Sequence, residues 1–129
     1  MLWYVMLGSA VGGGARFLLG TWIQQRSGAV FPIGTMIINI TGSFLLALLL
    51  RYATDSAAVG PETRALLTTG FCGGYTTFST FTYETSKLFE DGDWQRASWY
   101  IVLSVAVSLA GAFLGFAAAR QILAIRRRV

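Results

Sequence analysis

Two sets of neutral hydrogen-bonding side chains recur at helical spacing along this chain. The first set is Thr35, Asn39 and Ser43, and the second is Tyr100, Ser104 and Ser108. Each set advances in steps of four residues, so its members share one face of a helix. Such a face either joins two membrane helices by hydrogen bonds or lines a polar pathway, and the spacing leaves both interpretations open.

A third candidate is the stretch Gly70–Phe81, with the sequence GFCGGYTTFSTF. Its glycines each lower the helix propensity by roughly 1 kcal/mol relative to alanine. The hydroxyl side chains that follow compete for backbone hydrogen bonds. We therefore expect the helix to break at 70–77. Inside a membrane such a break persists only within protein or beside a wet cavity, which predicts a site for an ion or small solute. The alternative is a glycine-rich packing surface between helices.

The donors indicate the charge of the solute. Phe78 and Phe81 are three residues apart, so both rings can face one side, and the edge of a phenyl ring is partially positive. Ser79 adds a hydroxyl between them. A cation pathway needs carboxylates or carbonyl rings, whereas an anion pathway needs donors and positive potential. The polar faces contain no acid, which favours an anion. Arg16, in the first apolar segment, either attracts anions into a vestibule or extends to the membrane interface.

The same residues argue against an enzyme. The chain has no histidine, and its acidic residues cluster at the ends of the apolar segments. No nucleophile–base pair, phosphate loop or thiolate cluster can be assembled from it. The single cysteine, Cys72, is expected to be a small buried side chain.

Composition places the chain in a lipid bilayer. Of its 129 residues, 54% are hydrophobic and 12% are charged, and the mean hydropathy is +0.58. Soluble domains average about 25% charged residues. The net charge of +4 is then a signal of membrane topology, and we expect no nucleic-acid partner.

Four apolar segments must position the candidate residues, and we expect an all-α membrane protein with one transmembrane domain over 1–129. The segments lie at about 2–22, 33–52, 61–89 and 94–125. A helix crosses the hydrocarbon with about 20 residues, so the third segment is too long for one simple crossing. It suits two half-helices around the break. Pro61 after a glycine predicts a helix start, and Asp93 is expected to cap the fourth segment.

The stretch Gly70–Phe81 closely resembles the signature of the Fluc/CrcB fluoride channels. The glycines and arginine at Gly12–Arg16, the pair Gly34-Thr35, Asn39 and Gly42 agree with that family, and the resemblance covers the whole chain. The family usually has leucine where this chain has Tyr75. The resemblance implies an antiparallel, dual-topology homodimer of four-helix subunits with two fluoride pathways, whose third helices break and cross at mid-membrane.

The resemblance also assigns roles to individual residues. It implies a structural sodium ion held by the backbone carbonyls of Gly73 and Thr76 from both subunits. Fluoride coordination falls on Phe78 and Phe81, and the pore asparagine on Asn39. The polar track falls on Ser79, Tyr100 and Ser104, joined by Thr35 from the helical spacing, and Arg16 matches the family arginine.

We therefore expect a fluoride-selective channel of the cell (inner or plasma) membrane that lets toxic cytoplasmic fluoride leave down its electrochemical gradient. The alternative is a small dual-topology multidrug exporter coupled to protons. It needs a membrane-embedded carboxylate, for which Glu84 is the one candidate; otherwise Glu84 is expected to pair with Lys87 or another basic group. A third class, a non-transporting assembly or chromosome-associated membrane protein, is suggested only by the basic tail, Arg126–Arg128.

Overall fold

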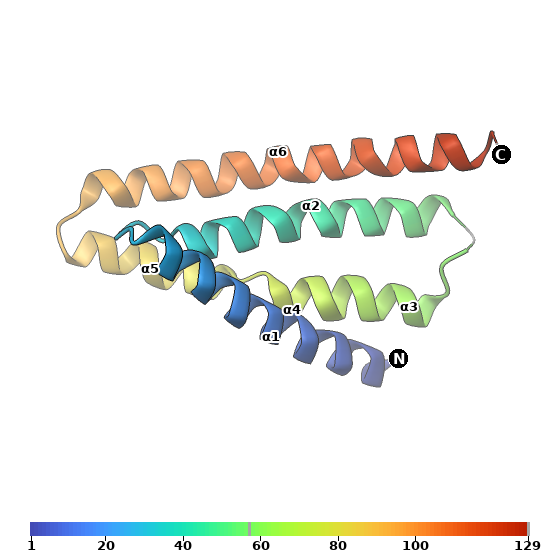
Figure 1. The fold of residues 1–129 in the computed structure, drawn as a ribbon, viewed down its shortest axis with the longest axis horizontal. Coiled ribbons are helices and arrows are strands. Elements are labelled where there is room, and N and C mark those ends of the chain that lie inside the picture. Colours follow the sequence, from blue (N-terminus) through green and yellow to red (C-terminus); the bar gives the residue numbers. More distant parts are fainter. Residues whose placement is uncertain (57, 129) are drawn as a thin grey trace.

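The computed structural model describes residues 1–56 and 58–128, and it contains only helices and short connections over those ranges (Figure 1). The elements are α1 (Leu2–Ser27), α2 (Ile33–Asp55), α3 (Pro61–Ala65), the π-helical stretch η1 (Leu66–Cys72), α4 (Gly73–Tyr75), α5 (Phe78–Glu90) and α6 (Trp94–Arg126). The run from α3 to α5 lies beside α2, and both termini lie at the same end of the molecule (Figure 1).

Three of the helices, α1, α2 and α6, are each long and apolar enough to cross a membrane. Large apolar side chains cover their outward faces; Trp3, Leu7 and Phe113, for example, are mostly exposed in the isolated chain. A water-soluble fold would bury such side chains, whereas lipid tails solvate them. The predicted class, an all-helical multi-pass membrane protein, is confirmed.

The helix boundaries follow local signals in the sequence. The first helix continues to Ser27 and not to about residue 22, because the chain first turns at Gly28, whose φ of 59° is left-handed. The start of α3 at Pro61 after Gly60 is confirmed. The cap of α6 is confirmed too: the Asp93 side chain accepts a hydrogen bond from the backbone N–H of Arg96.

Glycines let the helices approach one another closely. Gly8 and Gly12 of α1 are buried, and a Cβ at either position would meet the backbone of η1, at Leu66 and Phe71 respectively. Their four-residue spacing predicts this close packing. On the other side of the molecule Gly115 of α6 lies against the backbone of α2 at Phe44.

The helical path between α3 and α5 is interrupted over a shorter stretch than the expected 70–77. Only Thr76 (φ −82°, ψ 157°) and Thr77 (φ −150°, ψ 114°) are extended, while Gly70–Tyr75 remain helical. Gly70 and Gly74 serve contact with α1, where a Cβ would meet the backbone of Val5 and Ser9. Gly70 and Gly74 therefore act through packing, and the interruption falls on the two threonines.

Candidate functional site

Asn39 holds the extended link by both ends of its side-chain amide. Its Oδ1 accepts a hydrogen bond of 2.7 Å from the backbone N–H of Thr77, and its Nδ2 donates to the Thr77 carbonyl oxygen at 2.9 Å. This pairing fixes which end of the amide is oxygen, because only the oxygen can accept from an N–H group. The second proton on Nδ2 remains for another acceptor.

The hydrogen bond between Asn39 and the Thr77 N–H leaves a backbone carbonyl group free of its helical donor at the end of α4. Since the Thr77 N–H is committed to Asn39, the Gly73 carbonyl loses the donor that a continuous helix would supply. The neighbouring Gly74 carbonyl accepts a hydrogen bond of 3.1 Å from Nε of Arg16. A cation at this position also complements the negative end of the helix dipole.

Thr77 starts the next helix as well. Its Oγ1 accepts a hydrogen bond from the Thr80 N–H at 3.2 Å and donates to the Thr80 hydroxyl at 2.9 Å. The helical spacing did not predict this role, although threonine is one of the residues preferred at a helix N-cap.

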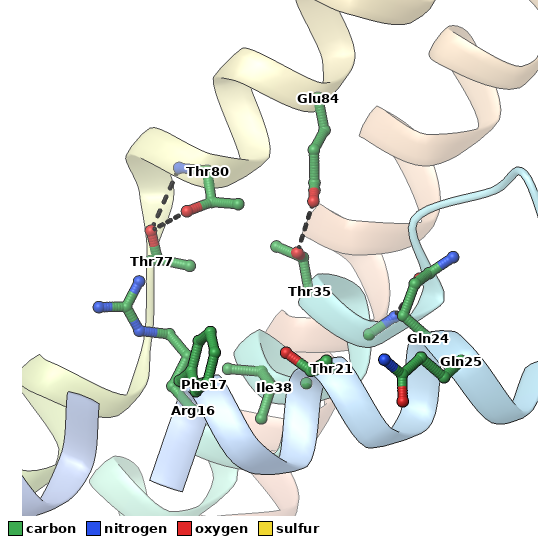
Figure 2. Close-up of a pocket in the computed structure, with 12 residues that line it drawn as sticks. Arg16, Phe17, Thr21, Gln24, Gln25, Thr35, Ile38, Thr77, Thr80 and Glu84 are labelled. Carbon is green, nitrogen blue, oxygen red and sulfur yellow. Dashed lines mark hydrogen bonds between the residues drawn. The ribbon is translucent and has the colours of Figure 1, made fainter. Parts of the chain in front are cut away.

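A polar cavity of about 470 Å³ lies on one side of this link (Figure 2). Figure 2 shows Glu84 of α5 reaching toward Thr35 of α2, with Arg16 of α1 below Thr77. The Glu84 carboxylate accepts hydrogen bonds from the Thr35 hydroxyl at 2.8 Å and from the Tyr100 hydroxyl at 2.6 Å. The expectation that Glu84 pairs with a basic residue is wrong, because Lys87 binds Asp91 and Glu90 instead.

A second cavity, of about 400 Å³ and largely apolar, lies on the other side of the link. Phe78 and Phe81 line it with ring centroids 5.7 Å apart and planes inclined by 46°. Ser104 also lines it, is 93% buried, and its hydroxyl has no hydrogen-bond partner among residues 1–56 and 58–128. A buried hydroxyl without a partner costs about 1–3 kcal/mol, so an acceptor that enters this cavity would be bound there.

Thr77 lines both cavities, so the clamp between it and Asn39 forms part of the partition between them. The expected polar face of α2 is accordingly divided. Thr35 faces the polar cavity, while Asn39 and Ser43 face the apolar one. Ser43 donates its hydroxyl to the Asn39 carbonyl of its own helix at 2.7 Å.

The remaining predicted residues lie near these cavities but differ in exposure. Tyr100 is fully buried, and its ring packs on Phe81 at 5.1 Å. Ser79 is exposed beside the Thr77 hydroxyl at 3.3 Å. Gly73 is exposed, and Phe78 is 76% exposed although it contributes to the apolar cavity.

The fold and the cavities define a multi-pass helical membrane protein with polar and apolar cavities that meet at a break in the helical path. Residues 3–116 match the family described as CrcB-like protein, Camphor Resistance (CrcB). The chain belongs to this family.

Several relatives of the chain carry one common name. The chain is 46% identical over 113 residues to a fluoride-specific ion channel FluC of Geobacter sulfurreducens, covering 88% of this chain and 91% of the relative. It is 44% identical over 119 residues to a protein of that name from Geotalea daltonii (92% and 96% covered), and 40% over 116 residues to one from Roseiflexus sp. (90% and 94% covered). These relatives are named as channels and not as enzymes.

Proposed function

We propose that this protein is a fluoride-selective channel that lets cytoplasmic fluoride leave the cell. The observation that carries the proposal is the Ser104 hydroxyl, which is buried in a cavity with Phe78 and Phe81 and has no hydrogen-bond partner in the described part of the chain. The names of the relatives support fluoride as the anion. A small, strongly hydrated anion needs donors at short range, which the Ser104 hydroxyl and the free Nδ2 proton of Asn39 supply, with partially positive ring edges beside them.

The working unit of this proposal is an antiparallel homodimer. Phe78, Ser79 and Gly73 are exposed in a single chain although they flank the interruption at Thr76 and Thr77. A second copy that covers this face would bury them. The chain from α3 to α5 then serves as a fourth membrane crossing, broken near mid-membrane, so that the link and its two cavities lie within protein.

A structural sodium ion fits the end of α4. The Gly73 carbonyl has lost its helical donor, and the Thr76 carbonyl lies in the extended link. Neutral carbonyl oxygens at a broken helix are ligands of alkali cations. Gly73 also leaves open space at its α-carbon, where a Cβ would meet no atom within 4 Å. The bound ion would accept lone pairs from these carbonyls and hold two copies together.

Ion efflux from liposomes tests the proposed function. Purified protein is reconstituted into vesicles loaded with potassium fluoride or potassium chloride, with a low concentration of sodium on both sides of the membrane. A potassium ionophore is added, and anion-selective electrodes record the release. We expect rapid fluoride efflux and negligible chloride efflux. Fluoride release no faster than from protein-free vesicles would overturn the proposal. Proton-coupled uptake of organic cations without fluoride flux would overturn it in favour of an exporter.

Removal of sodium tests the ion separately. In vesicles that contain only potassium or N-methylglucamine as cation, we expect fluoride flux to fall strongly and to return when sodium is added. Because carbonyl ligands select by size and charge, lithium should restore less flux than sodium at equal concentration. Flux indifferent to the complete exchange of sodium would remove the ion from the proposal and leave the anion pathway standing.

A further inference from the structure

The charged residues are divided unequally between the two ends of the helical bundle. The end that holds both termini, the close of α2, the start of α3 and the close of α6 is called the basic end (Figure 1). Its charged residues are Arg51, Arg64, Arg120, Arg126, Arg127 and Arg128, with Asp55 and Glu62. The opposite end carries Arg26, Lys87 and Arg96 against Glu90, Asp91 and Asp93. The net charge of +4 therefore resides at the basic end.

Ion pairs neutralise the opposite end but not the basic end. Lys87 lies 2.9 Å from Asp91, and Arg96 lies 2.8 Å from Asp93. At the basic end the described residues form a single ion pair, between Nε of Arg51 and Asp55 at 2.7 Å. The arginines at the close of α6 thus keep their full positive charge.

The close of α6 passes through the layer of lipid headgroups and ends at its outer edge, where long arginine side chains can reach the phosphate groups. No charged residue occurs between Arg96 and Arg120, so the hydrocarbon ends near Arg120. At a rise of about 1.5 Å per residue, Arg126 lies roughly 9 Å further along the helix axis. The headgroup layer on each side of a bilayer is about 5–8 Å thick. Trp3, at the same end, is 78% exposed, as is typical of aromatic residues at a membrane interface.

Two hydroxyl groups hold Arg126 in place. Its Nη1 donates a hydrogen bond of 2.7 Å to the Tyr52 hydroxyl and a longer one, of 3.5 Å, to the Ser56 hydroxyl. Tyr52 accepts from Arg126 and therefore keeps its own proton to donate. The guanidinium keeps donors on Nη2 and Nε, and such a fork matches two oxygens of a phosphate group. Ile125 beside it is 64% exposed, so the side chains around Arg126 are open to the membrane surface.

We propose that the basic end binds the phosphate groups of anionic phospholipids, with Arg126 and Tyr52 as the anchoring pair and Arg127 and Arg128 as further positive charge. The site is separate from both cavities, and it does not depend on the proposed function. In an antiparallel dimer it would recur in each leaflet.

Native mass spectrometry of the purified protein tests the proposal. The protein in detergent is incubated with dioleoylphosphatidylglycerol or dioleoylphosphatidylcholine, which share acyl chains and differ in headgroup charge. We expect preferential retention of phosphatidylglycerol by the wild type. R126Q/R127Q/R128Q should reduce that retention at least tenfold, since each basic residue at an anionic surface contributes about fivefold. The matched control R26Q/K87Q/R96Q removes the same charge from the opposite end and should retain the lipid.

A second variant distinguishes specific phosphate binding by Arg126 and Tyr52 from nonspecific attraction between positive charge and anionic lipid. Y52F removes one hydroxyl and no charge, and we expect it to lower retention of phosphatidylglycerol about two- to fivefold. Equal retention of both lipids by the wild type, or equal losses in the two triple variants, would overturn the proposal. Loss in R126Q/R127Q/R128Q without any loss in Y52F would reduce the site to a nonspecific charge effect and overturn the anchoring pair. Size-exclusion elution and thermal unfolding in detergent report that each variant is folded.

Discussion

Asn39 both joins two segments of the chain and lines a cavity. It joins α2 to the extended link through two hydrogen bonds to Thr77, and it lines the apolar cavity. The pairing with Thr77 uses one of the two Nδ2 protons. The other proton is available to an acceptor in the cavity. Its amide determines both the path of the backbone at Thr77 and one of the donors offered to the cavity.

Asn39→Ala removes both hydrogen bonds that hold the extended residues Thr76 and Thr77 against α2. We expect fluoride flux to fall at least tenfold, because the variant loses a donor to the cavity and leaves the Thr77 N–H unpaired, at a cost of about 1–3 kcal/mol. Ser43→Ala is the matched control, since the Ser43 hydroxyl bonds within its own helix, and we expect a smaller loss. Liposome efflux and size-exclusion elution are measured together. Unchanged flux with a dissociated dimer would show that Asn39 acts only between helices.

The aromatic pair permits a test of ring edges against apolar bulk. Phe81→Ile and Phe78→Ile keep large apolar side chains but remove the quadrupole of the ring. We expect fluoride flux to fall at least tenfold in each variant while expression and dimer formation persist. Phe113→Ile, on the outward face of α6, is the control and should retain flux. Near-normal flux in both cavity variants would assign Phe78 and Phe81 to packing alone.

At the scale of elements, close approach between α1 and the π-helical stretch depends on glycines. A Cβ at Gly12 would meet the backbone carbonyl of Phe71, which cannot move aside as a flexible side chain can. A Cβ at Gly14, two residues on, would meet no atom within 4 Å. The two positions therefore make a matched pair on one helix.

Gly12→Ala should destabilise the protein by about 1–3 kcal/mol, as overpacking of a close contact does. Gly14→Ala should be neutral or slightly stabilising, because alanine favours a helix by roughly 1 kcal/mol over glycine. Thermal unfolding in detergent, followed by tryptophan fluorescence, checks the difference. Equal melting temperatures for the two variants would contradict the packing of α1 against η1.

The sequence predicted the helices and their starts, but it did not predict which side chains from different helices meet. Apolar runs about 20 residues long predicted the helices, and local caps such as Pro61 and Asp93 predicted their starts. The pairing of Glu84 with Thr35 and Tyr100 joins three helices and leaves no periodic signal in any one of them. The expected break at the glycines was placed too early for a related reason. Whether a glycine interrupts a helix or lets another helix pack closely depends on the position of α1, which the local sequence does not specify.

At the scale of the whole molecule, the distribution of basic residues bears on orientation. With the amino terminus inside, the cytoplasmic set is Arg51, Arg64, Arg120, Arg126, Arg127 and Arg128, against Arg26, Lys87 and Arg96 outside. The surplus lies in the final tail, which comes last in the chain, and without Arg126–Arg128 the two sets are equal. A chain with so weak a bias can insert in both directions, as an antiparallel dimer requires.

Two single-cysteine variants test this orientation on a Cys72→Ala background. Cys72 is fully buried, so a small apolar residue is used to replace it. Val30→Cys places an exposed thiol in the loop after α1, and Ala58→Cys places one at the opposite end of the bundle. Sealed vesicles of defined orientation are labelled from outside with a membrane-impermeant maleimide. We expect about half of each variant to react, because an antiparallel dimer requires the two insertions to be equally populated. A single orientation would instead give nearly complete labelling of one variant and almost none of the other, and that pattern would exclude the antiparallel dimer.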